Sequence, residues 1–200
     1  MATNAPIAPV RDQRGERTAM LVIDMINPFD FEGGAAARRA AERVSETIIR
    51  LRSDADAHDV PTIYVNDNFG EWHSDRDRLI EAARPNLSGG AIEPRAGDFF
   101  VIKPQFSGFY STNLAVLLPK LGVRRLILTG IATEICVLIT AADAHMRDYA
   151  LWVPADAVVS LDDDHAAAAL DIMRKSMGAE TAPAAELALS TWMQRRADPE

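Results

Sequence analysis

The sequence predicts an α/β fold with helices on both faces of a mostly parallel sheet. Its strand candidates are short, continuous apolar runs such as residues 18–23, as expected for strands that are covered on both faces. Segments with helical spacing separate these runs along the whole chain, and no stretch repeats another. Such an alternation is typical of parallel sheets joined by right-handed crossovers. A chain of 200 residues, 48% of them hydrophobic, is sufficient for one such domain.

The individual elements are predicted from apolar runs, capping residues and helix breakers. Strands are expected at residues 18–23, 60–66, 99–102, 126–128 and 150–154. Helices are expected at residues 34–57 and 74–84, after N-caps at Ser111 and Thr133, and at residues 162–176 and 183–195. The segment 85–98 is rich in Pro and Gly and should be a loop. We expect a single domain at residues 18–196, with an arm at 1–17 and a tail at 197–200.

Composition limits the partners and the compartment. The 29 acidic residues outnumber the 21 basic ones, which form no run longer than a pair, so no nucleic acid is expected. No apolar run approaches the ~20 residues of a membrane span. The N-terminus lacks the apolar core of a signal peptide, and the single cysteine cannot form an intrachain disulfide. We therefore expect a cytoplasmic protein with no membrane contact.

Three chemically capable residues lie at or just beyond the carboxyl ends of predicted strands. Asp24 follows the first strand, Lys103 follows the third, and Cys136 follows the turn after the strand at 126–128. Sheets of this kind bind ligands beyond the carboxyl ends of their strands, where the strand order reverses. We therefore expect the fold to bring Asp24, Lys103 and Cys136 together.

Cys136 is the only cysteine, and its predicted place is the first turn of a helix. With Thr133 as N-cap it is the third helical residue, where free backbone N–H groups and the helix dipole favour negative charge. The thiol is therefore expected to be pushed toward thiolate. A free cysteine also serves as a small buried hydrophobe, so the interpretation depends on the joint placement with Asp24 and Lys103.

These three residues have the chemistry of a cysteine hydrolase. Asp24 can act as base, Lys103 can stabilise the anions, and Cys136 can attack a carbonyl carbon. Backbone N–H groups of Ala132 and Cys136 are candidates for an oxyanion hole. The product of attack is a thioester, which water hydrolyses with Asp24 again as base. This reaction cleaves a C–N bond of a small amide and needs no cofactor.

Three motifs carry a family resemblance. They are Leu21-Val22-Ile23-Asp24-Met25 with Asn27 and Phe29, Lys103 with Phe106-Ser107-Gly108-Phe109 and Thr112-Asn113-Leu114, and Gly130-Ile131-Ala132-Thr133-Glu134-Ile135-Cys136-Val137. The span from Thr18 to Glu180 resembles the isochorismatase-like cysteine hydrolase superfamily, which includes nicotinamidases and N-carbamoylsarcosine amidohydrolases. The resemblance implies that Asp24, Lys103 and Cys136 are a catalytic triad.

The same resemblance implies further structural features. It implies a three-layer α/β/α fold with a six-stranded parallel sheet of order 3-2-1-4-5-6. It places a non-proline cis peptide between Ile131 and Ala132. It also implies a homo-oligomer, a dimer or tetramer, acting on a small-molecule amide-like substrate.

Departures from the family pattern bear on the metal and the substrate. Metal-dependent nicotinamidases have an Asp, a His two residues later and a further His, whereas here Asp67 is followed by Asn68 and Phe69. We expect no metal, although His73 with Asp67 or Asp75 is a remaining ligand set.

Ile26 stands where many nicotinamidases have Gln, which disfavours nicotinamide as the substrate. The isochorismatase branch, which cleaves a vinyl ether, lacks the cysteine.

Aromatic residues close to the motifs are candidates for the wall of a substrate pocket. With one threonine added, the pocket candidates are Phe29, Phe69, Trp72, Phe106, Phe109 and Thr133. His145 and His165 are expected on helix surfaces. No cofactor is expected.

Other functions compete with a cysteine amidohydrolase. A nitrilase also orders a carboxylate, a lysine and a cysteine along the chain, but it uses Glu and a longer chain. A dinucleotide-binding protein needs a glycine-rich turn after the first strand, and residues 25–28 contain no glycine. A silent binding or interaction protein with the same fold, and a vinyl-ether hydrolase, remain as alternatives.

Overall fold

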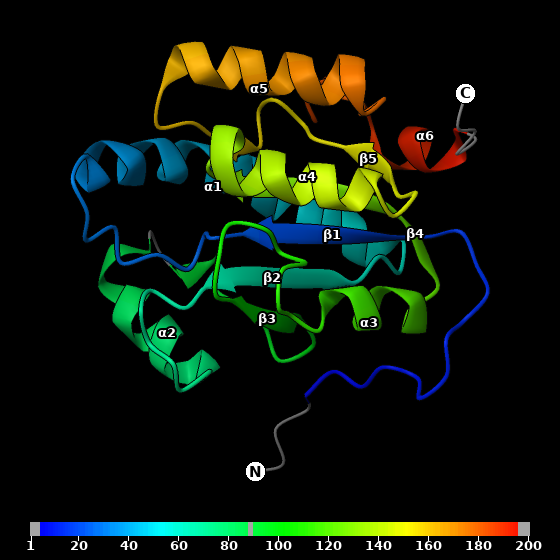
Figure 1. Cartoon of the computed structure of the whole chain (residues 1–200), viewed down its shortest axis with the longest axis horizontal. Coiled ribbons are helices and arrows are strands. Elements are labelled where there is room, and N and C mark those ends of the chain that lie inside the picture. The colour runs from blue at the N-terminus through cyan, green and yellow to red at the C-terminus, as the bar shows by residue number, and fades with distance from the viewer. Residues whose placement is uncertain (1–4, 88–89, 196–200) are drawn as a thin grey trace.

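The computed structural model describes residues 5–87 and 90–195, and its centre is a parallel sheet between two layers of helices (Figure 1). The strands are β1 (Arg17–Ile23), β2 (Thr62–Asp67), β3 (Phe99–Lys103), β4 (Val123–Ile131), β5 (Ala150–Trp152) and β6 (Val158–Val159). Every strand pair in the sheet is parallel. The first four residues of the predicted arm and the predicted tail lie outside the described residues.

The strand order is β3-β2-β1-β4-β5, and β6 also pairs with β4. Residues 125–127 of β4 pair with β5, and Gly130 and Ile131 beyond them pair with β6. On the far side of β5, Trp152 forms a parallel bridge with Glu180. The predicted three-layer fold class is confirmed. The apolar runs revealed only five strands because β6 is two residues long.

Two layers of helices cover the sheet. The helices are α1 (Gly34–Ala57), α2 (Arg76–Ala83), α3 (Leu114–Lys120), α4 (Leu138–His145), α5 (Asp163–Ser176) and α6 (Leu189–Gln194). A 3-10 turn η1 (Arg84–Asn86) follows α2, and a π-helical turn η3 (Thr133–Val137) precedes α4. Buried side chains of α1, α2 and α6 form one apolar core on the sheet, and those of α3, α4 and α5 form the other.

The predicted starts of α3 and α6 are wrong. Ser111 has a φ of 53°, outside the helical region, and α3 begins only at Leu114. The Thr112 hydroxyl accepts a hydrogen bond from the backbone N–H of Leu114, so Thr112 organises the turn that precedes α3. The last helix starts at Leu189 rather than at residue 183. The Asp156 carboxylate accepts hydrogen bonds from two backbone N–H groups there, at Ala184 and Ala185, and fixes a turn instead.

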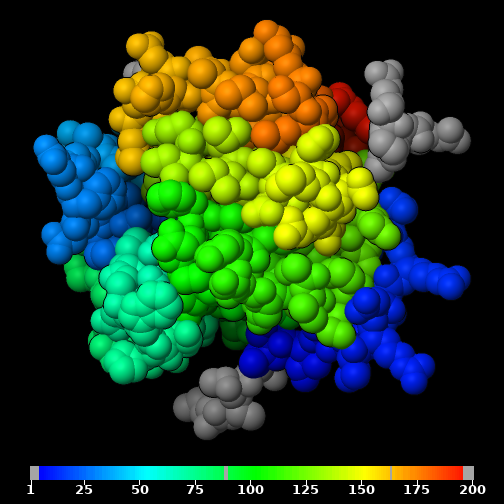
Figure 2. Space-filling view, viewed as in Figure 1, coloured from blue at the N-terminus to red at the C-terminus, as the bar shows by residue number. Residues whose placement is uncertain are grey.

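The chain before β1 lies over the end of α3 (Figure 2). The backbone N–H of Gln13 donates to the carbonyl of Pro119 at 3.0 Å, and the Lys120 ammonium donates to the carbonyl of Val10 at 2.6 Å. Residues 5–16 contain no helix or strand. Among the described residues, none of the helices has the length and apolar character needed to cross a membrane.

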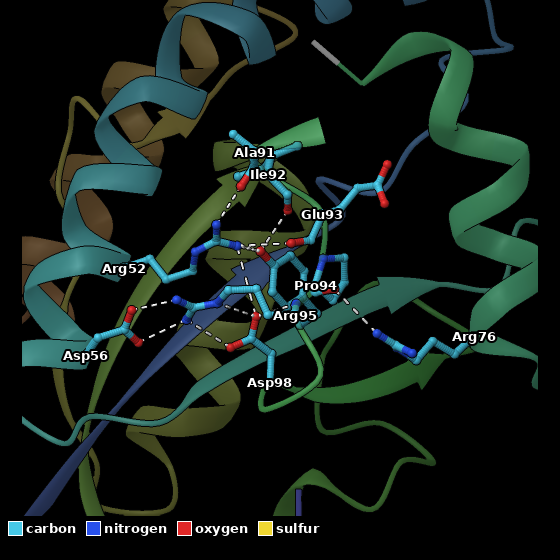
Figure 3. Close-up of polar contacts among 10 residues, drawn as sticks. Arg52, Asp56, Arg76, Ala91, Ile92, Glu93, Pro94, Arg95 and Asp98 are labelled. Carbon is cyan, nitrogen blue, oxygen red and sulfur yellow. Dashed lines mark hydrogen bonds and ion pairs between the residues drawn. The ribbon is translucent and has the colours of Figure 1, made fainter. Parts of the chain in front are cut away.

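A buried arginine fixes the loop that leads into β3 (Figure 3). Arg52 of α1 is 7% exposed and donates to the Tyr64 hydroxyl at 2.6 Å and to the carbonyl of Glu93 at 3.1 Å. Arg95 of the same loop pairs with Asp98 at 3.1 Å. Because the loop enters β3 at its amino end, this network lies away from the carboxyl ends of the strands, where Asp24 and Lys103 are found.

Candidate active site

Asp24 is the first residue after β1, at the centre of the sheet. Its φ of 51° lies in the left-handed region, a conformation that costs a non-glycine residue roughly 1–3 kcal/mol. Three hydrogen bonds or ion pairs hold it there. Its backbone N–H donates to the Val65 carbonyl at 3.0 Å, Oδ1 accepts from the Asp67 N–H at 2.7 Å, and Oδ2 lies 2.9 Å from Lys103 Nζ. The carboxylate is therefore fixed in position and direction.

Lys103 ends β3, and its side chain is completely buried. Its Nζ lies 2.9 Å from Asp24 Oδ2, 3.3 Å from Asp67 Oδ2 and 3.5 Å from Cys136 Sγ. A buried ammonium requires partners of this kind, because its desolvation is otherwise very costly. The predicted meeting of Asp24, Lys103 and Cys136 is present, and Lys103 is the residue that joins the other two.

Cys136 lies in η3, directly after β4, and is half-buried. Ala132, not Thr133, is the N-cap, and the Val137 N–H donates to the Ala132 carbonyl across five residues at 3.0 Å. The predicted helix start was therefore one residue late, and the wide first turn makes Cys136 the fourth residue of the turn. Single π-turns of this kind occur often at functional sites.

Glycine allows this turn to approach Asp24. Gly130 has a φ of 111°, and a Cβ there would lie 2.0 Å from the carbonyl oxygen of Ile23. Only glycine therefore lets the end of β4 lie against the end of β1. The peptide bond between Ile131 and Ala132 is cis. Ala132 and Cys136, the candidates for an oxyanion hole, lie on the turn that follows this bond.

The electrostatic environment corrects the predicted state of the thiol. Burial and the negative charge of Asp24 raise the pKa of Cys136 to about 12, against the opposing effect of Lys103. The resting group is therefore a thiol, not the thiolate expected from its position in a helix. Burial also raises the pKa of Asp24, although Lys103 opposes the shift. Burial disfavours the Lys103 ammonium, but the surrounding acidic groups raise its pKa overall.

These shifts permit one proton movement in particular. Release of the thiol proton to water leaves the Cys136 thiolate and the carboxylates of Asp24 and Asp67 beside one ammonium, that of Lys103. Transfer of the same proton from Cys136 to Asp24 leaves the net charge of the cluster unchanged. A carboxylate whose pKa is raised is a better proton acceptor. The arrangement can thus generate a thiolate at the moment of attack without a free thiolate in the resting state.

A second group of residues, which the sequence did not reveal as functional, holds the loop after Lys103 against α4. The Gly108 N–H donates to the Thr140 hydroxyl at 3.0 Å, and the Ser107 hydroxyl donates to the Asp143 carboxylate. Asp143 also pairs with Arg147 at 2.6 Å. The only signal in the sequence was the place of Ser107 and Gly108 in the second family motif.

Glu134 ties the turn that carries Cys136 to the segment before α5. Its carboxylate accepts hydrogen bonds from the Leu161 N–H and from the Ser160 hydroxyl, both at 2.9 Å. The Asp162 N–H in turn donates to Ser160 Oγ at 2.9 Å. Glu134 therefore holds η3 in position. Its place two residues before Cys136 in the sequence did not indicate this role.

The predicted pocket residues divide into buried and accessible groups. Phe109 is buried in the core, where its ring packs on Tyr149 with centroids 6.1 Å apart, and its contact with a substrate stays a prediction. Phe29 and Thr133 are also buried. The accessible pocket candidates are Phe69, Trp72 and Phe106. Phe69 and Phe106 flank the site in sequence, two residues after Asp67 and three after Lys103, and their contact with a substrate stays a prediction.

The remaining candidate metal ligands are not assembled. Asp67 Oδ2 pairs with Lys103, and the Asp75 carboxylate caps α2 by accepting from the N–H groups of Asp77 and Arg78. His73 is exposed. Within residues 5–87 and 90–195, no three or more His, Cys, Asp or Glu side chains are grouped so that they could hold a metal ion. His145 and His165 lie on helix surfaces, as predicted.

Known proteins share sequence motifs and fold with this chain. Residues 18–186 match the family model of the isochorismatase domain. The uncharacterized isochorismatase family protein YaaI of Bacillus subtilis (strain 168) is 39% identical over 165 residues, which cover 81% of this chain and 91% of that protein. The ureidoacrylate amidohydrolase RutB of Serratia proteamaculans (strain 568) is 30% identical over 172 residues, covering 71% and 69% respectively.

A solved structure shows the same likeness. The N-carbamoylsarcosine amidase from Thermoplasma acidophilum superposes with a TM-score of 0.68 at 28% sequence identity. The alignment covers 86% of this chain and 99% of that one.

Proposed function

Because the chain belongs to the isochorismatase family of hydrolases, we propose that it cleaves a C–N bond of a small amide or carbamoyl compound through a thioester on Cys136. The observation that carries the proposal is the contact of one buried ammonium, Lys103 Nζ, with both the Asp24 carboxylate and the Cys136 sulfur. The names of two similar proteins support the substrate class, since one is a ureidoacrylate amidohydrolase and the other an N-carbamoylsarcosine amidase.

The first half of the reaction forms the thioester. Asp24 takes the proton of the Cys136 thiol as the sulfur attacks the carbonyl carbon of the substrate. The carbonyl oxygen becomes negative and receives hydrogen bonds from the backbone N–H groups of Ala132 and Cys136. When the tetrahedral intermediate collapses, the C–N bond breaks and the protonated Asp24 gives its proton to the leaving nitrogen. Ammonia or an amine departs, and the acyl group stays on sulfur.

The second half restores the enzyme. Asp24, again a carboxylate, takes a proton from a water molecule that attacks the thioester carbon. The C–S bond breaks, the sulfur regains the proton from Asp24, and a carboxylic or carbamic acid leaves. Lys103 keeps its proton throughout, so its charge is present whenever an anion forms on the carboxylate or the sulfur.

The test is hydrolysis of a panel of small primary amides and carbamoyl compounds, followed by ammonia release. Wild-type protein should release ammonia from at least one member of the panel, and Cys136→Ala should release none above the uncatalysed rate. Rapid quenching and intact-mass measurement should show an acyl adduct on the wild-type chain. Glu71→Gln, a substitution on an exposed loop, is the control and should retain activity. Ammonia release that persists in Cys136→Ala would falsify the thioester mechanism.

A further inference from the structure

A second carboxylate shares the buried ammonium. Asp67 ends β2 opposite Lys103 in the register of β2 and β3, and its Oδ2 lies 3.3 Å from Lys103 Nζ. Its other oxygen accepts from the backbone N–H of Phe69 at 2.8 Å. The Asp67 side chain is 29% exposed, whereas those of Asp24 and Lys103 are 7% and 0% exposed. Asp67 is therefore the member of the charged cluster that reaches solvent.

The cluster carries more negative than positive charge. Lys103 can neutralise one carboxylate, and it is closer to Asp24, at 2.9 Å, than to Asp67, at 3.3 Å. The nearest arginines along the chain have other partners. Arg78 pairs with Glu71 at 3.2 Å, and Arg76 pairs with Asp77 at 3.1 Å. The charge of Asp67 is thus left without a full counter-charge.

This surplus charge lies beside the nucleophile. Asp67 Oδ2 and Cys136 Sγ both lie within 3.5 Å of the same nitrogen atom, Lys103 Nζ. A small molecule whose carbonyl carbon reaches the sulfur therefore has its neighbouring atoms close to the Asp67 carboxylate. When water is partly excluded, the Asp67 charge at this close range changes the binding of a charged group on that molecule by about tenfold.

We propose that Asp67 selects substrates by charge, favouring neutral or cationic N–H-bearing amides and rejecting those with a carboxylate close to the scissile bond. This specificity rests on the proposed amide hydrolysis, because it concerns the same site. The Asp67 carboxylate accepts a hydrogen bond from an N–H group of a suitable substrate, and it repels an anionic one. The residue acts in recognition, while Asp24 handles the proton.

Alkylation of the single cysteine tests this proposal without any substrate. Iodoacetamide and iodoacetate alkylate a thiol by the same substitution, in which the sulfur attacks the CH2 carbon and iodide leaves. The first reagent is neutral and the second is anionic. Rates on Cys136 are measured by intact mass and divided by the rates on a free thiol, N-acetylcysteine, under the same conditions. We expect the normalised rate with iodoacetate to be at least about tenfold lower than with iodoacetamide.

Asp67→Asn is the informative variant. Asn keeps an oxygen for the Phe69 N–H and nearly the same shape, so the loop should keep its fold, which a thermal melt verifies. We expect the variant to reduce the discrimination between the two reagents by about tenfold. Glu71→Gln removes the same charge from the exposed loop four residues later and should leave the discrimination unchanged.

Two outcomes overturn the proposal. In one, wild-type Cys136 discriminates between the reagents no better than N-acetylcysteine does. In the other, Asp67→Asn and Glu71→Gln alter the ratio equally, which shows that only the net charge of the protein acts. Because alkylation requires no turnover, a changed ratio with no hydrolysis of any amide would remove the proposed function and leave charge selection standing. Hydrolysis of an amide together with an unchanged alkylation ratio would support the proposed function and remove charge selection by Asp67.

Discussion

Burial and the neighbouring charge of Asp24 together hold the thiol of Cys136 in its protonated state. Burial raises the pKa of the thiol, the Asp24 charge raises it further, and the two together outweigh Lys103. The most reactive form of the site is therefore not its resting form. Asp24 suppresses the free thiolate and, in the proposed reaction, accepts the proton that makes it.

Asp24→Asn separates these two effects. The variant removes the negative charge beside the sulfur, so the pKa of Cys136 should fall and iodoacetamide labelling near pH 8 should become about tenfold faster. Amide hydrolysis should be lost, because Asn cannot accept the proton. Labelling is followed by intact mass and hydrolysis by ammonia release. If labelling and hydrolysis both slowed, Asp24 would not be the group that raises the thiol pKa.

Wild-type labelling should show the raised pKa directly. With a thiol pKa of about 12, the labelling rate should still increase with pH where a free thiol, with a pKa of about 8.5, has already reached its plateau. The measurement is the iodoacetamide rate across that range, with N-acetylcysteine as the reference. A plateau that coincides with that of the reference would contradict the electrostatic description of the site.

Lys103→Met should lower the free energy of unfolding, and this loss should be smaller at low pH than at high pH. The variant leaves the buried Asp24 without a counter-charge, at a cost of about 3–5 kcal/mol. Burial then raises the Asp24 pKa without the opposing charge of Lys103, so the folded state binds a proton that the unfolded state has released. The free energy of unfolding must therefore fall as the pH rises from the pKa of Asp24 in the unfolded chain to its raised pKa in the folded state.

Urea unfolding tests this sign. The midpoint of Lys103→Met should be higher near pH 5 than near pH 8, by more than in the wild type. The double variant Asp24→Asn, Lys103→Met removes both charges and should recover most of the stability near pH 8. A double variant as unstable as Lys103→Met alone would mean that Lys103 stabilises the fold through packing rather than charge.

At the scale of elements, the loop after β3 depends on the absence of a side chain at one position. A Cβ on Gly108 would lie 2.9 Å from Val65 Cγ1 and 3.4 Å from side-chain atoms of Leu114 and Thr140. The loop is therefore pressed between β2 and α4, the helix that continues from the turn carrying Cys136. Its close packing links the position of Lys103 to that of the nucleophile.

Gly108→Ala should lower the free energy of unfolding by about 1–3 kcal/mol through overpacking. Val65→Ala in the same chain makes room for the added methyl group, so the two substitutions together should cost less than the sum of each alone. Gly97→Ala is the matched control, since nothing lies within 4 Å of its new Cβ, and it should be close to neutral. Denaturant unfolding of the four variants measures the coupling; additive effects would argue against the contact.

The sequence predicted different elements with different success. The long α1 and the strand that leads to Asp24 were predicted within one residue of the observed bounds. A continuous apolar run marks the strand, and the pair Gly33-Gly34 before an alanine- and arginine-rich segment marks the helix. The start of α3 was missed since it depends on the Thr112 hydroxyl and on a left-handed Ser111. The last helix was predicted too long because a carboxylate far away in sequence, Asp156, holds its expected first turn open.

At the scale of the molecule, the gathering of Asp24, Lys103 and Cys136 was predictable because parallel strands end at one edge. Their electrostatics were not, because a pKa depends on burial and on the distances among all the charges. Asp67 illustrates the difference: from the sequence it was a possible metal ligand, while the structure pairs it with Lys103. Sequence patterns indicate which residues meet, and their mutual distances decide what each one does.

The molecule also divides its buried charges between two ends of the sheet. Arg52, with Tyr64 and Asp98, fixes the loop that enters β3, while the cluster around Lys103 lies at the carboxyl ends of the strands. The two groups share no residue. Stability contributed by the first group should therefore be separable from the chemistry of the second.

Arg52→Leu tests this separation. It removes the hydrogen bonds that Arg52 donates to the Tyr64 hydroxyl and to the carbonyls of Ala91 and Glu93, while Asp98 keeps its ion pair with Arg95, so the free energy of unfolding should fall by about 3 kcal/mol. At temperatures where the variant is still folded, the iodoacetamide labelling rate of Cys136 should match that of the wild type within about twofold, because a network at the far end leaves the charges beside the sulfur unchanged. Thermal melts give the first quantity and intact mass the second. A labelling rate that changed strongly in the folded variant would show that the loop entering β3 controls the position of Lys103, and that the two ends of the sheet act as one unit.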